Sequence, residues 1–373
     1  VAAAALAGRG NPVSSAGFRK PNGHILEALA GELQEVLPEA RSASIARILF
    51  GSISRLDEEG VDLLRLAGEL SAGPMSARLL TAVFAVVDQL EEPAAARRVA
   101  VGKEQIRAKA LASPVDECTD SLGIHPLVAR TARFADPKPA RRAALRAAAG
   151  AALAATLEAA DPTDAQGQSV LAEAITHARG LLGGLSDWIS EPELRLLGVV
   201  ARLDYVNGRY HAAASLFQQQ WSTSRRELGE GHPVTLAAMD SLAGTLHALE
   251  APDGARQLYE EIVAAGRQTR GEEHPATLAA MNNLARSLHA LGEFAEARQL
   301  HEQVLAARRR TLGDDHPITL DSMSNLALAQ QATGDLAEAR QLHEQVLAAR
   351  RQILGEDHPD TLAAMNNVAE LVH

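Results

Sequence analysis

The chain has 373 residues, and its 36 basic and 47 acidic side chains give a formal net charge of −11, which argues against nucleic acid as a partner. Aromatic residues make up only 3% of the sequence, so a core must be built from leucine, alanine, valine and methionine, which favours packed helices over a sheet sandwich. The single cysteine, Cys118, excludes an intrachain disulfide, and no apolar run is long enough to span a membrane, so a reducing cytoplasm is the expected location.

Both ends of the sequence resemble internal positions of a longer protein. Residue 1 is Val rather than Met, and the sequence stops at His373 within a repeat. We therefore expect the natural protein to be longer. Residues 1–40 are rich in Ala, Gly and Pro and are expected to form a linker or the end of an upstream module, with a short helix over residues 26–37.

Four helices are expected to follow. The first has apolar residues at helical spacing from Ser44 onward, and Ser42 or Ser44 would cap its start. The acidic run 57–59 opens the second, because negative charge is favourable at the positive end of the helix dipole. The third and fourth are predicted over residues 76–87 and 93–111.

The helical pattern is interrupted at two places before residue 182. Residues 113–123 lack a helical period and are consistent with a short hairpin or wing. Residues 136–139 hold two prolines and are interpreted as a boundary. Beyond them, residues 140–160 and 169–182 are predicted to pair as an antiparallel helical hairpin.

Four His-Pro dipeptides recur at a fixed interval of 42 residues, and the sequence between them repeats as well. Self-similarity at such a period indicates stacked units that each bury a face against the next. Proline suits the first position of a helix, because its missing N–H has no helical partner there. A more degenerate unit precedes them at residues 191–229. The dipeptides are His232-Pro233, His274-Pro275, His316-Pro317 and His358-Pro359.

Each unit consists of two predicted helices, which we name helix A and helix B. In one unit helix A is predicted over residues 277–291 and ends at Gly292, because glycine readily ends a helix. Helix B is predicted over residues 295–310 and ends at Gly313. Its last turn carries arginines, which are favourable at the negative end of the helix dipole.

Several polar residues of the repeats have more than one possible role. One His-Pro histidine per repeat cannot cluster around a metal, so we predict that these histidines cap or pack at helix starts. The arginines at 308–310 and 350–351 could hold an acidic ligand, although a solvated helix end is the simpler expectation. The chain has no Gly-rich phosphate-binding loop, and His301-Glu302 lacks the second histidine of a zinc-protease motif. No catalytic, cofactor or metal site is therefore expected, and the chain is not predicted to be an enzyme.

Residues 190–373 resemble the tetratricopeptide repeat family, in the 42-residue form of kinesin light chains. His301 stands where the family has an aromatic residue, and Phe217 and Tyr259 fill that position earlier; Glu250 and Pro252 depart from the usual turn. The resemblance implies a right-handed superhelical solenoid whose helices A line a concave groove for a protein or peptide. The matching residues in one unit are Met281, Leu284, Ala285, Leu288, Gly292, Phe294, Ala297 and Leu305.

The resemblance also places a set of candidate binding residues in that groove. Amide side chains can both donate to and accept from an extended peptide backbone, so a row of asparagines is a reasonable binding rail. The alternative is that these asparagines form hydrogen bonds between repeats or are solvated. The candidates are Asp240, His247, Asn282, Asn283, Arg286, His289, Ser324, Asn325, Asn366 and Asn367.

The amino-terminal half carries a second resemblance. Residues 44–47, 52–59 and 63–67, and the segment His125 to Val128 with Arg130 and Arg133 after it, are similar to the winged-helix region of bacterial STAND ATPases of the NB-ARC type. The overall expectation is thus an all-α fold with a winged-helix-like domain followed by the repeat solenoid. The expected parts are a linker at 1–40, a winged-helix-like domain at 41–136, a helical hairpin at 137–189 as a degenerate repeat, and repeats at 190–373 with the last one truncated.

Two functions follow from these resemblances. The first is the sensing and regulatory half of a STAND-type signalling ATPase, with the ATP or ADP site and its domain upstream of Val1 and in intramolecular contact with this chain. The second is an adaptor whose groove holds a partner without any ATPase. Both predict a protein or peptide partner, and neither predicts nucleic acid or a membrane as one.

Overall fold

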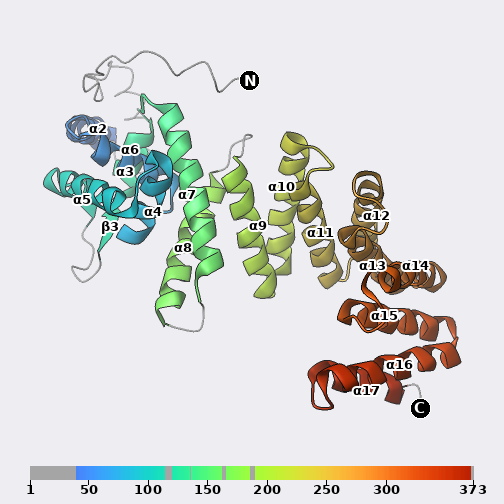
Figure 1. Ribbon diagram of the computed structural model, residues 1–373. Helices are drawn as coiled ribbons and strands as arrows, with labels where there is room; N and C mark the ends of the chain where they lie inside the picture. The colour runs from blue at the N-terminus through green and yellow to red at the C-terminus, as the bar shows by residue number, and fades with distance from the viewer. Residues whose placement is uncertain (1–38, 114–119, 135, 162–164, 185–189, 371–373) are drawn as a thin grey trace. The chain divides into compact units, whose positions relative to one another are not determined.

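The computed structural model describes residues 39–113, 120–134, 136–161, 165–184 and 190–370 (Figure 1). Within these residues the chain is mostly helical, with 16 helices and three short strands, so the all-α expectation omits a small sheet. None of the described helices is long and apolar enough to cross a membrane. The helix expected over residues 26–37 and Cys118 both lie outside the described residues.

The chain divides into two compact units, Val1–Val200 and Ala201–His373, and each is described by itself. The narrower domain limits expected from the sequence stay predictions. The first unit begins with elements that alternate between helix and strand. They are α2 (Glu39–Ile53), α3 (Glu58–Glu69), β1 (Met75–Ser76), α4 (Ala77–Asp88), α5 (Glu92–Ala108), β2 (Ala112–Ser113), β3 (Ser121–Ile124) and α6 (Pro126–Phe134).

Local signals explain where three of these helices begin. Asp57 precedes α3, and two glutamates occupy its first turn. The Ser76 hydroxyl accepts a hydrogen bond from the Leu79 N–H at 3.2 Å and caps α4. His125 accepts from the Leu127 N–H at 3.2 Å at the start of α6, so a His-Pro pair begins a helix here too.

The start of α2 corrects one prediction. The helix begins at Glu39, upstream of Ser42 and Ser44, so neither serine caps it. Its buried face consists of Ala46, Phe50 and Ile53. Ile48, which shares the apolar pattern, is 66% exposed, because residues two positions from Ala46 and Phe50 lie on another side of the helix.

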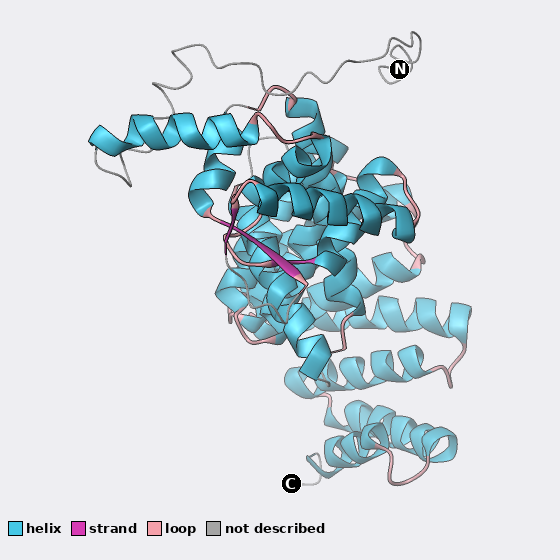
Figure 2. Ribbon diagram, turned by 90° about the vertical axis from the view of Figure 1, so that its left-hand side faces the viewer, coloured by secondary structure: helices cyan, strands magenta, loops and turns pink. Residues whose placement is uncertain are grey.

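The three strands form one small antiparallel sheet in the order β1-β3-β2 (Figure 2, magenta). Met75 pairs with Leu122, and Ala112 pairs with Ile124. The β2-β3 pair is the hairpin expected around residues 113–123, and β1 is a strand that the sequence does not predict.

Three further helices follow along the chain, α7 (Pro139–Ala159), α8 (Ala165–Gly183) and α9 (Glu191–Val206).

A buried charge network joins α7 to α3. Asp62 is fully buried and accepts from Arg65 at 2.7 Å, from Arg98 at 2.9 Å and from Arg141 of α7 at 2.7 Å. Arg65 also donates to Asp136 at 2.9 Å, so the segment interpreted as a boundary is tied to α3 through its own carboxylate.

The second unit is a series of helix pairs, and each helix packs on the next along the chain (Figure 1). This confirms the helix-A and helix-B interpretation of the 42-residue repeat. Helices A are α11, α13, α15 and α17, and helices B are α10, α12, α14 and α16. Their bounds are α10 (Tyr210–Leu228), α11 (Pro233–Ala248), α12 (Pro252–Thr269), α13 (Pro275–Ala290), α14 (Phe294–Leu312), α15 (Pro317–Thr333), α16 (Leu336–Leu354) and α17 (Pro359–Glu370).

The His-Pro histidines cap helices A, as the sequence predicts. In all four repeats the histidine Nδ1 accepts from the backbone N–H two residues later, at 3.2 Å. Each bond satisfies one of the N–H groups that a helix start leaves without a helical partner. Because the four rings serve four separate helix starts, they do not converge on one metal.

The turns between helices A and B use a left-handed residue. Gly292 has φ 82° and Gly334 has φ 90°. In the repeat that begins at His232 this position is Glu250, which takes φ 57° although it is not a glycine, and Pro252 then begins α12. The departure in sequence therefore preserves the turn but places a side chain in a strained backbone conformation.

Candidate binding face of the repeat array

The candidate residues lie on one side of helices A, which we call the helix-A face. It carries Asp240 and His247 on α11, and Arg286 and His289 on α13. None of these four belongs to the buried core of the repeats, which is built from residues such as Leu278, Met281 and Leu284 of α13. Ser324 and Asn325 on α15 and Asn366 and Asn367 on α17 continue the face.

Two of the asparagines form a hydrogen bond from one repeat to the next. The Asn325 side-chain amide donates to the Asn282 side-chain oxygen at 3.0 Å. Asn283 lies beside the Asp240 carboxylate and the Tyr259 hydroxyl and acts to lower the pKa of both groups. The alternative of hydrogen bonds between repeats therefore describes Asn282 and Asn325, and contact of the asparagines with a ligand stays a prediction.

The carboxylate of Asp240 is partly desolvated and lies without a cationic partner among the described residues. Surrounding protein atoms displace water from the Asp240 carboxylate and raise its pKa, although the residue is exposed; the neighbouring Asn283 acts in the opposite direction. Burial, and then the charge of Asp240, raises the pKa of the neighbouring Tyr259 hydroxyl.

Arg286 carries a positive charge on the helix-A face of α13. It is exposed and has no ion-pair or hydrogen-bond partner in the described parts of the chain. Burial, together with the charge of Arg286, lowers the pKa of His247 on the preceding helix A. His289 lies one turn beyond Arg286, and its ring packs edge-on against Phe294, with ring centroids 5.0 Å apart. An anion at this position would meet a guanidinium that has no other counter-ion.

The aromatic position of helix B is filled by histidine in two repeats. His301 is 3% exposed and its Nδ1 has no partner in the described structure; His343 is 1% exposed, and neither ring nitrogen has one. Burial, followed by the charges of His289, Arg308 and Arg286, lowers the pKa of His301 to about 4. Burial likewise lowers the pKa of His343. Both rings are therefore neutral packing elements at neutral pH.

Two of these arginines, Arg308 and Arg350, are not simply solvated, which corrects the sequence-based expectation for them, whereas Arg309, Arg310 and Arg351 are exposed as expected. Arg308 is buried and donates to the Ser322 hydroxyl at 2.7 Å and to the Ile318 carbonyl at 3.3 Å. Arg350 donates to the Asp360 carbonyl at 3.0 Å and to Asp321 at 2.5 Å. A position near the end of a helix does not predict these contacts, because the two side chains turn toward the neighbouring helices A and donate hydrogen bonds to acceptors on them.

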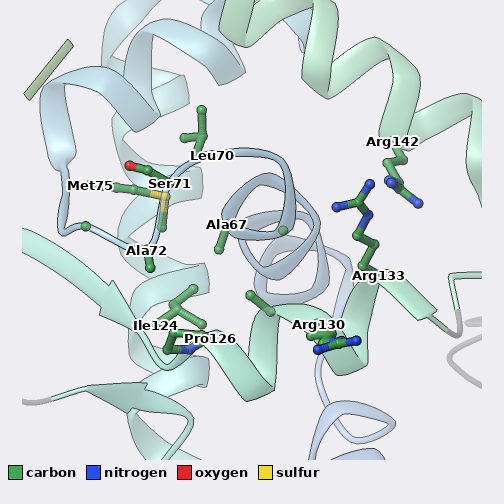
Figure 3. Close-up of a pocket in the computed structure, with 13 residues that line it drawn as sticks. Ala67, Leu70, Ser71, Ala72, Met75, Ile124, Pro126, Arg130, Arg133 and Arg142 are labelled. Carbon is green, nitrogen blue, oxygen red and sulfur yellow. The ribbon is translucent and has the colours of Figure 1, made fainter. Parts of the chain in front are cut away.

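The first unit contains a separate hollow of about 740 Å³ (Figure 3). Met75, Ile124 and Pro126 lie on one side of it, whereas Arg133 and Arg142 lie on the other. Arg142 donates to the buried Glu69 at 2.5 Å. The hollow thus combines apolar and basic walls, and sequence patterns did not reveal it because its walls come from α3, β3, α6 and α7.

Comparison with known proteins defines the class of the array. The tetratricopeptide repeat family matches residues 242–310, 276–352 and 323–373. The second unit is therefore a helical-repeat array, and residues 242–373 of it are tetratricopeptide repeats. The match does not extend over residues 190–241, where the sequence also resembles this family.

Several solved structures are similar to the chain. A Podosopora anserina protein described as a kinesin light chain with nearly identical TPR-like repeats matches with 36% identity over 48% of this chain and 84% of that chain, at a TM-score of 0.44. A single-residue variant of it matches with 35% identity over 49% and 87%, at 0.46. BtubC (BKLC) from P. vanneervenii matches with 20% identity over 61% and 87%, at 0.44. Among curated proteins, none matches this sequence significantly.

Proposed function

We propose that the helix-A face binds an extended segment of a protein partner and that Arg286 receives an acidic side chain of that segment. The single observation that carries this proposal is the exposed guanidinium of Arg286, which has no counter-ion among the described residues. Tetratricopeptide repeats are stacked units whose joint surface is suited to long, thin ligands.

The contact would contribute more to orientation and association rate than to total affinity. A solvent-exposed ion pair is weak on its own and is screened by salt. A planar guanidinium, however, binds a carboxylate in a fixed bidentate geometry. Partner binding should therefore weaken with rising salt, and the partner segment should have one preferred position along the face.

The experiment is a screen of the full chain against an array of immobilised random octapeptides. We expect enrichment of peptides that contain Asp or Glu, and we expect Arg286→Glu to remove most of that enrichment while the helical content stays unchanged. Arg351→Ala is the matched control, since Arg351 is an exposed arginine in the last turn of a helix B. Equal binding of acidic peptides by the wild type and Arg286→Glu would contradict the proposal.

We further propose that this binding face belongs to the regulatory half of a STAND-type switch. The order α3-β1-α4-α5-β2-β3 supports a winged-helix-like domain in the first unit, because it places a helix, a strand, two helices and a hairpin in sequence. In such a switch the partner must bind one conformational state of the whole protein more tightly than the other.

The test is the coding sequence upstream of Val1 and the nucleotide dependence of partner binding in the full protein. A phosphate-binding loop upstream, with partner affinity that differs between ATP and ADP, is the expected result. An upstream sequence without such a loop, with nucleotide-independent binding, would instead favour an adaptor without ATPase linkage. The peptide-binding proposal for Arg286 would stand in either case.

A further inference from the structure

One position of helix B differs between repeats in a way that leaves a space. Gly266 of α12, Arg308 of α14 and Arg350 of α16 are 42 residues apart and therefore equivalent. Arg308 donates to the Ile318 carbonyl of the next helix A, and Arg350 donates to the Asp360 carbonyl, which is the equivalent atom. In these two repeats the array thus fills the space beside its helices A with its own guanidinium groups.

At Gly266 the guanidinium is missing and a pocket takes its place. The pocket has a volume of about 260 Å³ and lies between α11 and α13, with α12 behind it. A water molecule occupies about 30 Å³ of liquid, so the pocket has room for several waters or for one long side chain. Its wall includes Ala276, which is equivalent to Ile318 and Asp360, and Ala237, which is equivalent to the Asp321 that binds Arg350.

The pocket wall carries one acidic and one basic side chain. Asp240 lines the pocket, it is partly desolvated, and it has no cationic partner among the described residues. Arg270 also lines the pocket, at the end of α12, where Leu312 and Leu354 stand in the next two repeats. Its charge opposes an incoming cation, so we expect a weak and selective site rather than a tight one.

We infer that this pocket accepts the guanidinium of an arginine side chain from the partner segment. The backbone carbonyl of Ala276 would take the role of the Ile318 and Asp360 carbonyls, and the Asp240 carboxylate would supply the counter-ion. This inference rests on the proposed function, since it assumes a segment that lies along the helix-A face. It adds that the segment carries an arginine close to its acidic residue, because Asp240 and Arg286 lie on neighbouring helices beside the same tyrosine, Tyr259.

The test uses the full chain with labelled alanine methyl groups, since Ala237, Ala276 and Ala280 all line the pocket. The probe is N-acetyl-arginine amide, and its uncharged isostere N-acetyl-citrulline amide is the control ligand. We expect the arginine probe to shift these methyl signals with saturation in the millimolar range, and the citrulline probe to bind at least tenfold more weakly. Arg270→Ala should tighten binding of the arginine probe, and Asp240→Asn should weaken it severalfold.

Two reciprocal variants test the repeat comparison directly. Gly266→Arg should fill the pocket and abolish the response to the probe. An added Cβ at Gly266 would lie 2.8 Å from the Thr277 hydroxyl, but arginine and threonine already coexist at the equivalent Arg308 and Thr319, so we expect the array to fold. Arg308→Gly should open a second pocket, and the arginine probe should then raise the melting temperature of this variant more than that of the wild type.

The outcomes separate this inference from the proposed function. Absence of any pocket methyl shift, or the same response in wild type and Asp240→Asn, would overturn the inference and leave the role of Arg286 intact. Loss of peptide binding in Arg286→Glu, with an unchanged response of this variant to the arginine probe, would support both the proposed role of Arg286 and the arginine pocket. If Gly266→Arg does not fold, the Asp240→Asn and citrulline comparisons still decide the result.

Discussion

The side-chain N–H of Asn325 on α15 donates a hydrogen bond of 3.0 Å to the side-chain oxygen of Asn282 on α13, the preceding helix A. Because the two residues are 43 positions apart in a 42-residue repeat, the bond joins one position of a repeat to the following position of the next. Asp240 and Asn283 are neighbours with the same spacing, and Asn283 acts to lower the pKa of Asp240. The polar groups of the helix-A face therefore hold the stacking register as well as offering a surface to a partner.

Removal of one asparagine should test this role. Asn325→Ala leaves the Asn282 side chain without its partner at a half-buried position, so we expect a loss of about 1 kcal/mol in the free energy of unfolding. Asn282→Ala should cost a similar amount, and the double variant should cost less than the sum. Urea denaturation measures all three. Asn366→Ala, at an exposed position of α17, is the control and should change stability little.

Glu250 offers a site at which stability should rise. Its left-handed conformation, φ 57°, costs a non-glycine residue about 1 to 2 kcal/mol. Glycine at this position would remove that cost. Glycine also makes the unfolded chain more flexible, which offsets part of the added stability. We therefore expect Glu250→Gly to raise the free energy of unfolding by about 1 kcal/mol in urea denaturation.

The reverse change at Gly292 provides the matched comparison. An added Cβ at Gly292 would meet no other atom within 4 Å, so the effect of Gly292→Ala comes from the backbone alone. We expect a loss of about 1 kcal/mol or more. A neutral result for both variants would mean that this turn relaxes away from the left-handed region.

The sequence predicts the helices of the array well because its signals are local. Proline at the helix start, the capping histidine and the left-handed glycine each act within a few residues, so they can be recognised without knowledge of the tertiary structure. The site could be predicted only in part. The hydrogen bonds of Arg308 and the charge network at Asp62 depend on which helices pack together, and no local sequence pattern contains that information. The replacement of arginine by Gly266 is visible when the repeats are aligned. That it leaves a pocket is recognised only from the contacts of Arg308 and Arg350.

Asp62 should be the most sensitive position of the first unit. It is fully buried and pairs with Arg65, Arg98 and Arg141, so its removal leaves these three arginines with only two carboxylates, Asp88 and Asp136, in a low-dielectric region. We expect Asp62→Ala to lower the free energy of unfolding by about 3 to 5 kcal/mol. Removal of the exposed Lys138 to Glu58 pair by Lys138→Ala should cost less than about 1 kcal/mol. Similar losses in the two variants would contradict the importance of the buried network.

The buried imidazole of His301 should make the array sensitive to acid. Because burial and the neighbouring positive charges lower the pKa of His301 from 6.5 to about 4, the unfolded chain takes up this proton more readily than the folded chain. The stabilising contribution is full above about pH 6.5 and is lost as the pH falls toward 4. The loss for this residue is at most on the order of 3 kcal/mol.

An aromatic substitution at His301 should remove this part of the acid sensitivity. Tyr259 already occupies the equivalent position of another repeat, so His301→Phe should pack in a similar space and carry no titrating group. We expect the stabilities of His301→Phe at pH 7 and pH 4.5 to lie closer together than those of the wild type, as measured by urea denaturation at both values. His211→Phe, on an exposed surface, should keep the wild-type difference. The imidazole of His301 would have no part in the response if the wild type and His301→Phe lost the same stability in acid.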